Sequence, residues 1–198
     1  PNAQLVQADS LMQKSPDSAL HFLEKIYPEK LKSLEDQAYY ALLVTQAQDK
    51  NYIFQENDSL IRVAVQYYDS IKSTSMQAKA HYYWGCIWRN REIYPQALSR
   101  FFTAISYAQK TSDHKLTGYI YNNIANLYFL QKLYEQADSI YQITEKIAIQ
   151  EKDSGLWADA LSQRGMIAID RGKEYYHEAE QEILHAFKIS RHIAQKKM

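Results

Sequence analysis

The chain has 198 residues with 23 basic and 23 acidic side chains, so its formal net charge at pH 7 is zero. This balance gives no electrostatic surface for nucleic acid, and we expect no nucleic-acid partner for this domain. No run of about 18 apolar residues occurs, which predicts no membrane span in this chain. Hydrophobic residues make up 46%, with only 5 Gly and 4 Pro, which predicts a folded and mostly helical protein.

The N-terminal residues predict a first pair of helices. An amphipathic helix is expected over residues 3–13. Ser15 then suits an N-cap, Pro16 the first turn of a helix, and Asp17 the positive end of the helix dipole. We therefore expect the first hairpin over residues 3–27.

A second hairpin is expected over residues 34–71. Its first helix covers residues 34–48, and a loop follows over residues 49–56. Asn57 and Asp58 are suitable caps for the second helix of this pair.

The clearest feature of the chain is one pattern that occurs twice. The first copy comprises His81, Trp84, Gly85, Trp88, Ala97, Phe101 and Ala104. The second copy, each member 40 residues later, comprises Tyr121, Ile124, Ala125, Tyr128, Ala137, Tyr141 and Thr144. Because positions three and four apart share a helix face, each copy forms two stripes that only neighbouring helices can bury. Hairpins are therefore expected over residues 76–110 and 114–151.

A weaker third copy predicts a last hairpin over residues 156–197. Its stripe residues are Leu161, Gly165 and Ala168, followed by Ala179, Ile183 and Ala186. The second helix of this pair is acidic early and basic late, which matches the helix dipole at both ends. We expect this terminal helix to cover the last repeat.

The repeated pattern resembles the tetratricopeptide repeat (TPR), a helix–turn–helix unit that stacks into a solenoid. The period of about 40 residues exceeds the usual 34, so the chain is similar to longer-period bacterial members, among them sensor and regulator proteins. The resemblance implies an all-α, right-handed α–α superhelix of about five hairpins, forming a single domain over residues 1–198. The chain departs from the family pattern in two ways. No unit has the usual closing proline, and the first two units match the pattern in their second helices only.

The same resemblance implies a function. We expect a non-enzymatic module with no cofactor that binds a protein or peptide partner through its concave groove, as a scaffold or adaptor. The alternative is the sensory domain of a bacterial regulator whose membrane and DNA-binding parts lie outside these residues. A hydrolase or phosphatase built on the solenoid is a third hypothesis, but no catalytic constellation supports it. The segment Pro16–Leu20 resembles envelope-anchored members, which implies a periplasmic or lipid-anchored location if an N-terminal signal was removed.

In such a solenoid the first helices line the concave side, and their faces turned away from the second helices are open to a ligand. These faces carry Tyr39, Leu42, Gln46 and Asp49; Lys79, Tyr82, Cys86 and Arg89; Tyr119, Asn122, Asn126 and Phe129; and Asp159, Ser162, Met166 and Ile169. Aromatic area, amide groups and an arginine suit a peptide. We therefore expect the peptide-binding residues to be Tyr82, Arg89, Asn122, Asn126 and Phe129. The competing interpretation is a solvated groove without a ligand.

We assign a structural role to the other reactive side chains. Cys86 is the only cysteine; Arg89 nearby could lower the pKa of its thiol, yet packing is the favoured interpretation. Asn123 is expected to bridge to a neighbouring helix. Some members of the family bind a terminal carboxylate with a clamp of several polar residues; only Asn123 matches that clamp here, so no chaperone-tail site is expected. His185 and His192 lack a third ligand, so no metal site is expected.

Overall fold

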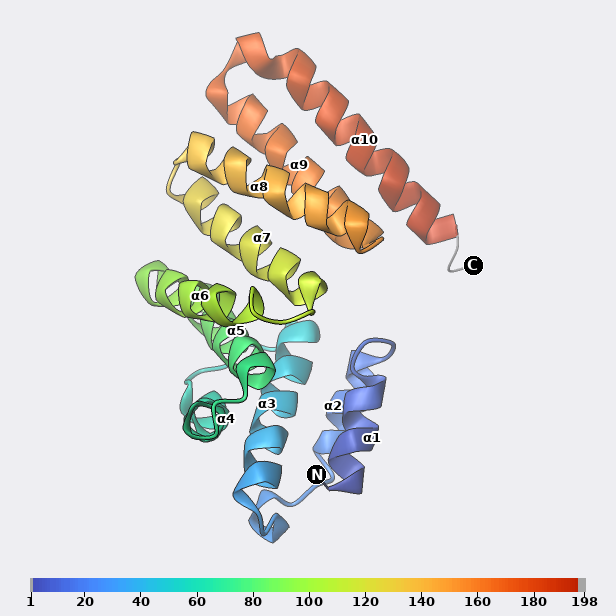
Figure 1. Ribbon diagram of the computed structural model, residues 1–198. Helices are drawn as coiled ribbons and strands as arrows, with labels where there is room; N and C mark the ends of the chain where they lie inside the picture. Colours follow the sequence, from blue (N-terminus) through green and yellow to red (C-terminus); the bar gives the residue numbers. More distant parts are fainter. Residues whose placement is uncertain (1, 196–198) are drawn as a thin grey trace. The chain divides into compact units, whose positions relative to one another are not determined.

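A computed structural model describes residues 2–195 and shows an all-α chain, which confirms the predicted fold class (Figure 1). No β-strand occurs among these residues. The chain divides into two compact units with a boundary between Lys110 and Thr111; we call them unit 1 and unit 2 and describe each by itself. This boundary falls between the third and fourth expected hairpins, and the single domain over 1–198 stays a prediction.

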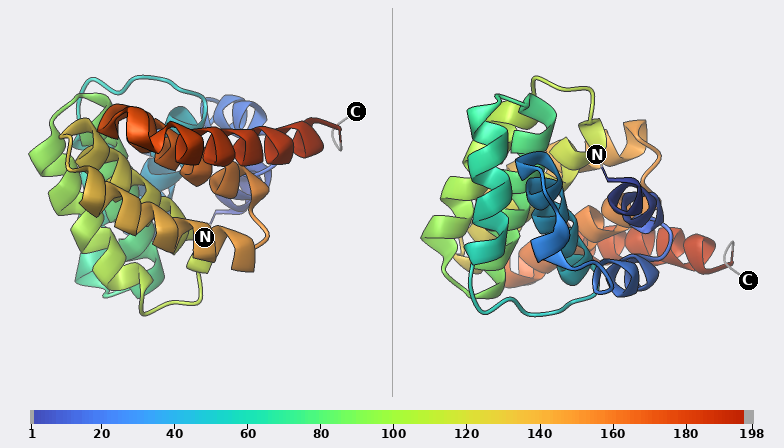
Figure 2. Two further views of the ribbon diagram at one scale, coloured as in Figure 1. Left: turned by 90° about the horizontal axis from the view of Figure 1, so that it is seen from above. Right: turned by 90° about the horizontal axis from the view of Figure 1, so that it is seen from below.

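Unit 1 contains six α-helices and a short 3₁₀ turn among its described residues (Figures 1 and 2). They are α1 (Ala3–Leu11), α2 (Pro16–Leu23), η1 (Pro28–Lys30), α3 (Leu34–Lys50), α4 (Ser59–Ser70), α5 (Thr74–Asn90) and α6 (Tyr94–Ala108). Helices α1 and α2, α3 and α4, and α5 and α6 contact each other as pairs, and α5 also contacts α3. Helix α2 ends earlier than the expected hairpin boundary, and a turn over the next residues leads into Pro28.

As far as residue 195, unit 2 contains two further helix pairs; the helices contact each other within each pair, and α8 contacts α9 between the pairs. Its elements are α7 (His114–Leu130), α8 (Tyr134–Gln150), α9 (Ser154–Arg171), η2 (Lys173–Tyr175) and α10 (Tyr176–Gln195). Residues 196 and 197 of the last expected hairpin lie outside the described part of the chain.

Small residues let the paired helices approach closely. Gly85 on α5 faces the ring of Phe101 on α6, where a Cβ added to the glycine would lie 2.5 Å from ring atom Cε1. Gly165 on α9 faces Ile183 on α10 in the same way, with Ala179 beside it. The small members of the sequence pattern therefore lie where a side chain from the second helix needs the space.

Five helices end in the same tight turn, although none of these turns contains glycine. The residue two positions after α3, α4, α5, α7 and α8 has a left-handed backbone, with φ between 53° and 61°: Tyr52, Lys72, Glu92, Lys132 and Lys152. In each case the next N–H donates to the carbonyl five residues earlier, as Leu133 N does to Tyr128 O at 3.0 Å. This is the Schellman arrangement, which satisfies carbonyls that a helix end leaves open.

Candidate functional site

A cavity of about 310 Å³ in unit 1 opens among α1, α3, α4 and α5. The first helices contribute Tyr39, Leu42, Gln46 and Lys79, all from the face that the sequence predicted to contact a ligand. The remaining lining residues are Asp9, Glu35, Leu43, Tyr67, Tyr68, Ile71, Ser73 and Met76. We call this cavity the Tyr39 pocket.

Two tyrosines of the Tyr39 pocket, Tyr39 and Tyr68, stay neutral. The Tyr39 hydroxyl donates to Asp9 Oδ2 at 2.7 Å and so joins α3 to α1. Burial, followed by this hydrogen bond, raises the pKa of Tyr39 far above its usual range. Burial also raises the pKa of Tyr68, whose ring meets Tyr67 edge-on at 5.4 Å between centroids. These phenols therefore offer aromatic area and hydroxyl groups rather than charge.

Further along α5, two of the predicted ligand-facing residues are buried. Tyr82 is 8% exposed and Cys86 is also buried; the Tyr82 ring lies 6.0 Å from that of Phe101 on α6, between centroids. Burial raises the pKa of the Cys86 thiol, with Asp49 adding to the rise and Arg89 acting in the opposite direction. The thiol is therefore held in its protonated form, and the packing interpretation of Cys86 agrees with this environment.

Arg89 has fixed partners in unit 1. Its Nη2 lies 3.2 Å from Asp49 Oδ1 on α3, and Nη2 and Nε donate to Asn90 Oδ1 at 2.8 and 3.0 Å. Burial raises the pKa of Asp49, although the Arg89 guanidinium acts in the opposite direction. The Arg89–Asp49 ion pair thus connects α5 to α3.

In unit 2, α7 carries the other three predicted residues, Asn122, Asn126 and Phe129. Asn122 Nδ2 donates to Asp159 Oδ2 at 2.6 Å, which links the two helices. Asn126 and Phe129 are half-buried on α7, and the Phe129 ring lies 6.0 Å from that of Tyr134. On α9, Met166 and Ile169 are exposed. We call Asn122, Asn126, Phe129, Asp159 and Met166 the α7–α9 surface.

One atom of the α7–α9 surface has an unmet hydrogen-bonding capacity. Asn122 Oδ1 is buried and has no donor among the residues that the structure describes. Because Nδ2 of the same amide donates to a carboxylate, the orientation of the amide is fixed by this bond. Asn123 differs, since it is buried and donates to the Tyr119 carbonyl of its own helix at 2.9 Å.

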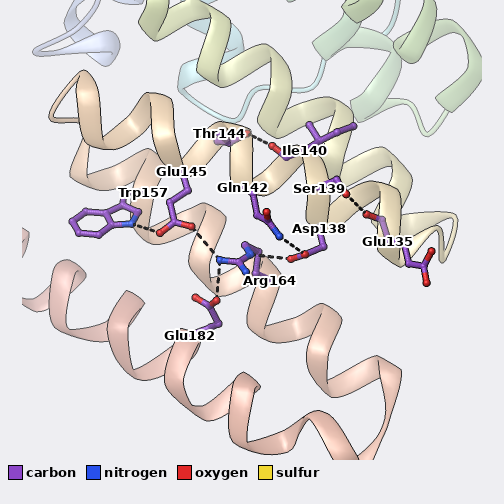
Figure 3. A network of polar contacts seen from close by, with 10 residues as sticks. All are labelled: Glu135, Asp138, Ser139, Ile140, Gln142, Thr144, Glu145, Trp157, Arg164 and Glu182. Carbon is purple, nitrogen blue, oxygen red and sulfur yellow. Dashed lines mark hydrogen bonds and ion pairs between the residues drawn. The ribbon is translucent and has the colours of Figure 1, made fainter.

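A charged cluster in unit 2 was not predicted from the sequence (Figure 3). Arg164 Nε lies 2.8 Å from Asp138 Oδ1, and Arg164 Nη1 lies 3.1 Å from Glu145 Oε2 and 2.8 Å from Glu182 Oε1. Trp157 Nε1 also donates to Glu145 Oε1 at 3.2 Å. We call these residues the Arg164 network; they join α8, α9 and α10. The acidic partners are 18 to 26 residues from Arg164 in sequence, too far for helical periodicity to pair them.

The described residues present neither a metal centre nor a membrane span. Among residues 2–195, no group of three or more His, Cys, Asp or Glu side chains is placed to hold a metal ion. Within the described part of the chain, no helix combines the length and apolar character needed to cross a membrane.

Comparison with known proteins gives matches in structure alone: no family model matches the sequence, and no curated protein does. BtubC (BKLC) from P. vanneervenii is 13% identical, with a TM-score of 0.69 over 97% of this chain and 75% of that chain. A putative kinesin light chain from Podosopora anserina with nearly identical TPR-like repeats is 13% identical, with a TM-score of 0.64 over 95% and 93% of the two chains.

A third solved structure comes from Pyrococcus horikoshii. It is a signal transduction ATPase with numerous domains and a tetratricopeptide repeat sensor, 16% identical, with a TM-score of 0.65 over 92% of this chain and 29% of that chain. TPR-like folds are repeat scaffolds that generally serve protein interaction and are typically non-catalytic. The chain has the all-α helical-repeat fold of the tetratricopeptide type, as its sequence spacing predicted.

Proposed function

We propose that this chain is a protein-interaction module that binds extended peptide segments of a partner through the first helices of its hairpins. The observation that carries this proposal is the Tyr39 pocket. Four of its lining residues, Tyr39, Leu42, Gln46 and Lys79, belong to the face that the repeat spacing assigned to a ligand, and its volume of about 310 Å³ suits a peptide side chain. The repeat fold, which generally serves as an interaction scaffold, supports the same conclusion.

The lining of the Tyr39 pocket suits an apolar or aromatic side chain of a peptide. Leu42, Ile71 and Met76 provide apolar surface, and the fixed tyrosine rings add rigid contact area at little entropic cost. Gln46 and Lys79 add polar groups; an amide can bond both the N–H and the C=O of a peptide main chain. We therefore assign the anchoring of one peptide side chain to this pocket.

The α7–α9 surface supports the proposal independently within unit 2. Asn122, Asn126 and Phe129 follow one another at helical spacing and therefore share a face of α7. The Asn122 amide is held on this face by the bond from its Nδ2 to Asp159 Oδ2, and Asn126 and Phe129 are half-buried. We assign direct peptide contact to these three residues.

Tyr82 and Arg89 receive a different role in the proposal. Tyr82 is buried and Arg89 is paired with Asp49 across α3 and α5. We assign both residues to positioning α5 beside the Tyr39 pocket, so their substitution lowers stability as well as binding.

The test begins with a random peptide library displayed on phage and selected on the immobilised chain. Titration calorimetry with a synthetic selected peptide then compares Ile71→Ala, Lys79→Ala, Asn122→Ala and Phe129→Ala with the unaltered chain. Each residue that contacts the peptide should cost about 1–3 kcal/mol of binding free energy. Ile143→Ala, which removes an exposed apolar side chain from α8, is the matched control and should bind normally. Normal binding by all four variants, together with loss in Ile143→Ala, would overturn the proposal.

A further inference from the structure

The outer flank of α10 carries a stripe of exposed apolar side chains. Phe187 is 63% exposed and Leu184 is 46% exposed, and Tyr176 is also exposed. At 100° per residue these three side chains lie on one flank of the helix together with Glu180 and Arg191. We call these five residues the α10 stripe. Ala179 and Ala186 are buried instead, where α10 packs on α9, and Ile183 contacts Gly165 of α9.

The repeat register shows how the fold treats this flank elsewhere. Ala137 on α8 corresponds to Ala179 on α10, which aligns Asp138 with Glu180 and Glu145 with Phe187. On α8 this flank contacts α9, because Arg164 of α9 bonds Asp138 and Glu145. The flank is therefore a helix-packing surface in the preceding hairpin, and its apolar counterpart on α10 has the composition to pack a helix.

The distribution of charge along α10 indicates which helix would pack on the α10 stripe. Glu180 in the first half of α10 lies on the stripe, whereas Arg191 in the second half lies on it and Lys188 lies beside it. Two copies of α10 that cross in antiparallel orientation place each acidic half against a basic half, twice in one interface. In the same arrangement the two Leu184 side chains meet near the two-fold axis, and Tyr176 lies opposite the Arg191 guanidinium. A parallel arrangement would instead oppose like charges.

We propose that the α10 stripe is a self-association surface on which α10 of a second copy of this chain packs in antiparallel orientation. The interface is isologous, so one patch contacts itself across a two-fold axis and the assembly closes as a dimer. This inference does not depend on peptide binding, because it uses none of the residues of the Tyr39 pocket or the α7–α9 surface.

Sedimentation velocity over a concentration series of the whole chain tests the inference. The unaltered chain should show a monomer–dimer equilibrium. Leu184→Glu and Phe187→Glu should raise the dimer dissociation constant at least tenfold while circular dichroism and the melting temperature of the monomer stay unchanged. Phe102→Glu, which places the same charge on an exposed aromatic position of α6, is the matched control and should dimerise normally. A chain that is monomeric at every concentration, or a dimer that tolerates Leu184→Glu, overturns the proposal.

A charge exchange then tests the antiparallel orientation. Glu180→Lys opposes two ammonium groups at both ends of the interface, because the substituted side chain meets Lys188 of the other copy. Lys188→Glu opposes two carboxylates in the same places, so each single variant should dimerise poorly. An equal mixture of the two variants restores attractive pairs and should form a heterodimer. Failure of the mixture to associate would rule out the antiparallel packing.

Discussion

Arg164 Nη1 lies 2.8 Å from Glu182 Oε1, and this ion pair connects α9 to α10 inside unit 2. The same guanidinium also holds Asp138 and Glu145, so one cation balances three partly buried carboxylates. Burial raises the pKa of Glu182; Arg164 acts against this rise, and the neighbouring carboxylates Glu145 and Asp138 add to it. The cluster therefore depends on Arg164 more than on any one of its acids.

Replacing Arg164 with Met should lower the free energy of unfolding by about 2–3 kcal/mol. Removal of one partner leaves uncompensated charges, which costs about 3–5 kcal/mol for a fully buried pair. The Arg164 side chain is 15% exposed, so water screens part of this cost. Urea denaturation followed by circular dichroism measures the loss. Lys146→Met on the exposed surface of α8 is the control and should change stability by no more than about 0.5 kcal/mol. Equal stability of the two variants would contradict the proposed role of the network.

Asp153 and Asp113 form a matched pair of helix caps, 40 residues apart. Asp113 Oδ1 accepts from Leu116 N at 3.0 Å at the start of α7, and Asp153 Oδ1 accepts from Leu156 N at 3.1 Å at the start of α9. Asp153 Oδ2 additionally accepts from the Tyr119 hydroxyl at 3.0 Å and lies 2.9 Å from Lys115 Nζ. Loss of a cap costs about 1 kcal/mol, so Asp113→Ala should cost about that much and Asp153→Ala about 1 kcal/mol more.

The difference in cost between Asp153→Ala and Asp113→Ala should depend on pH. Burial acts to raise the pKa of Asp153, but the hydrogen bonds from Lys115, Leu156 N–H and Tyr119 outweigh it, and the net result is a pKa below the ordinary 3.8. A carboxyl with a lowered pKa in the folded state stabilises the fold above the unfolded-state pKa, and this contribution is lost as pH falls through the folded-state pKa. The excess cost of Asp153→Ala should therefore be complete at neutral pH and shrink below pH 3.8. Urea titrations in both pH ranges measure it; an excess that stays constant would contradict the assignment.

Glycine at the left-handed turn positions should stabilise the chain. Lys132 and Lys152 have φ of 61° and 55°, a conformation that costs an L-residue about 1–2 kcal/mol, whereas glycine adopts it readily. Part of the gain is offset because glycine makes the unfolded chain more flexible. We expect Lys132→Gly and Lys152→Gly each to add about 0.5–1 kcal/mol to the free energy of unfolding, measured by urea denaturation. Lys146→Gly inside α8 is the control and should cost about 1 kcal/mol. Destabilisation by the turn variants would contradict the role of backbone strain.

The sequence predicted the paired helices well because their stripes recur at fixed spacing, as Gly85 and Phe101 illustrate. It did not predict the turns, because a lysine or glutamate in a left-handed conformation has no distinctive sequence signal. The exposure of Tyr82 was also predicted wrongly. Helical spacing identifies which residues share a face, but it does not identify the neighbouring side chains that cover that face, and here Phe101 of α6 packs beside the Tyr82 ring.

Gly85→Ala should destabilise unit 1 although alanine is the better helix former. The added Cβ would lie 2.5 and 2.6 Å from Cε1 and Cδ1 of Phe101, whose ring is fully buried. The cost of overpacking, about 1–3 kcal/mol, exceeds the gain in helix propensity of about 1 kcal/mol. Gly155→Ala on α9 is the matched control. A Cβ added there would have Asp153 Oδ1 as its nearest neighbour at 3.5 Å, an ordinary contact, so this variant should be neutral or stabilising by up to about 1 kcal/mol.

The contact between Gly85 and Phe101 is tested by Phe101→Leu, which removes ring atoms. Because the two residues touch, the double variant should lose less free energy of unfolding than the two single variants lose together. Urea denaturation of the four variants gives the coupling energy, and a value of zero would show that the Phe101 ring does not limit the space at Gly85.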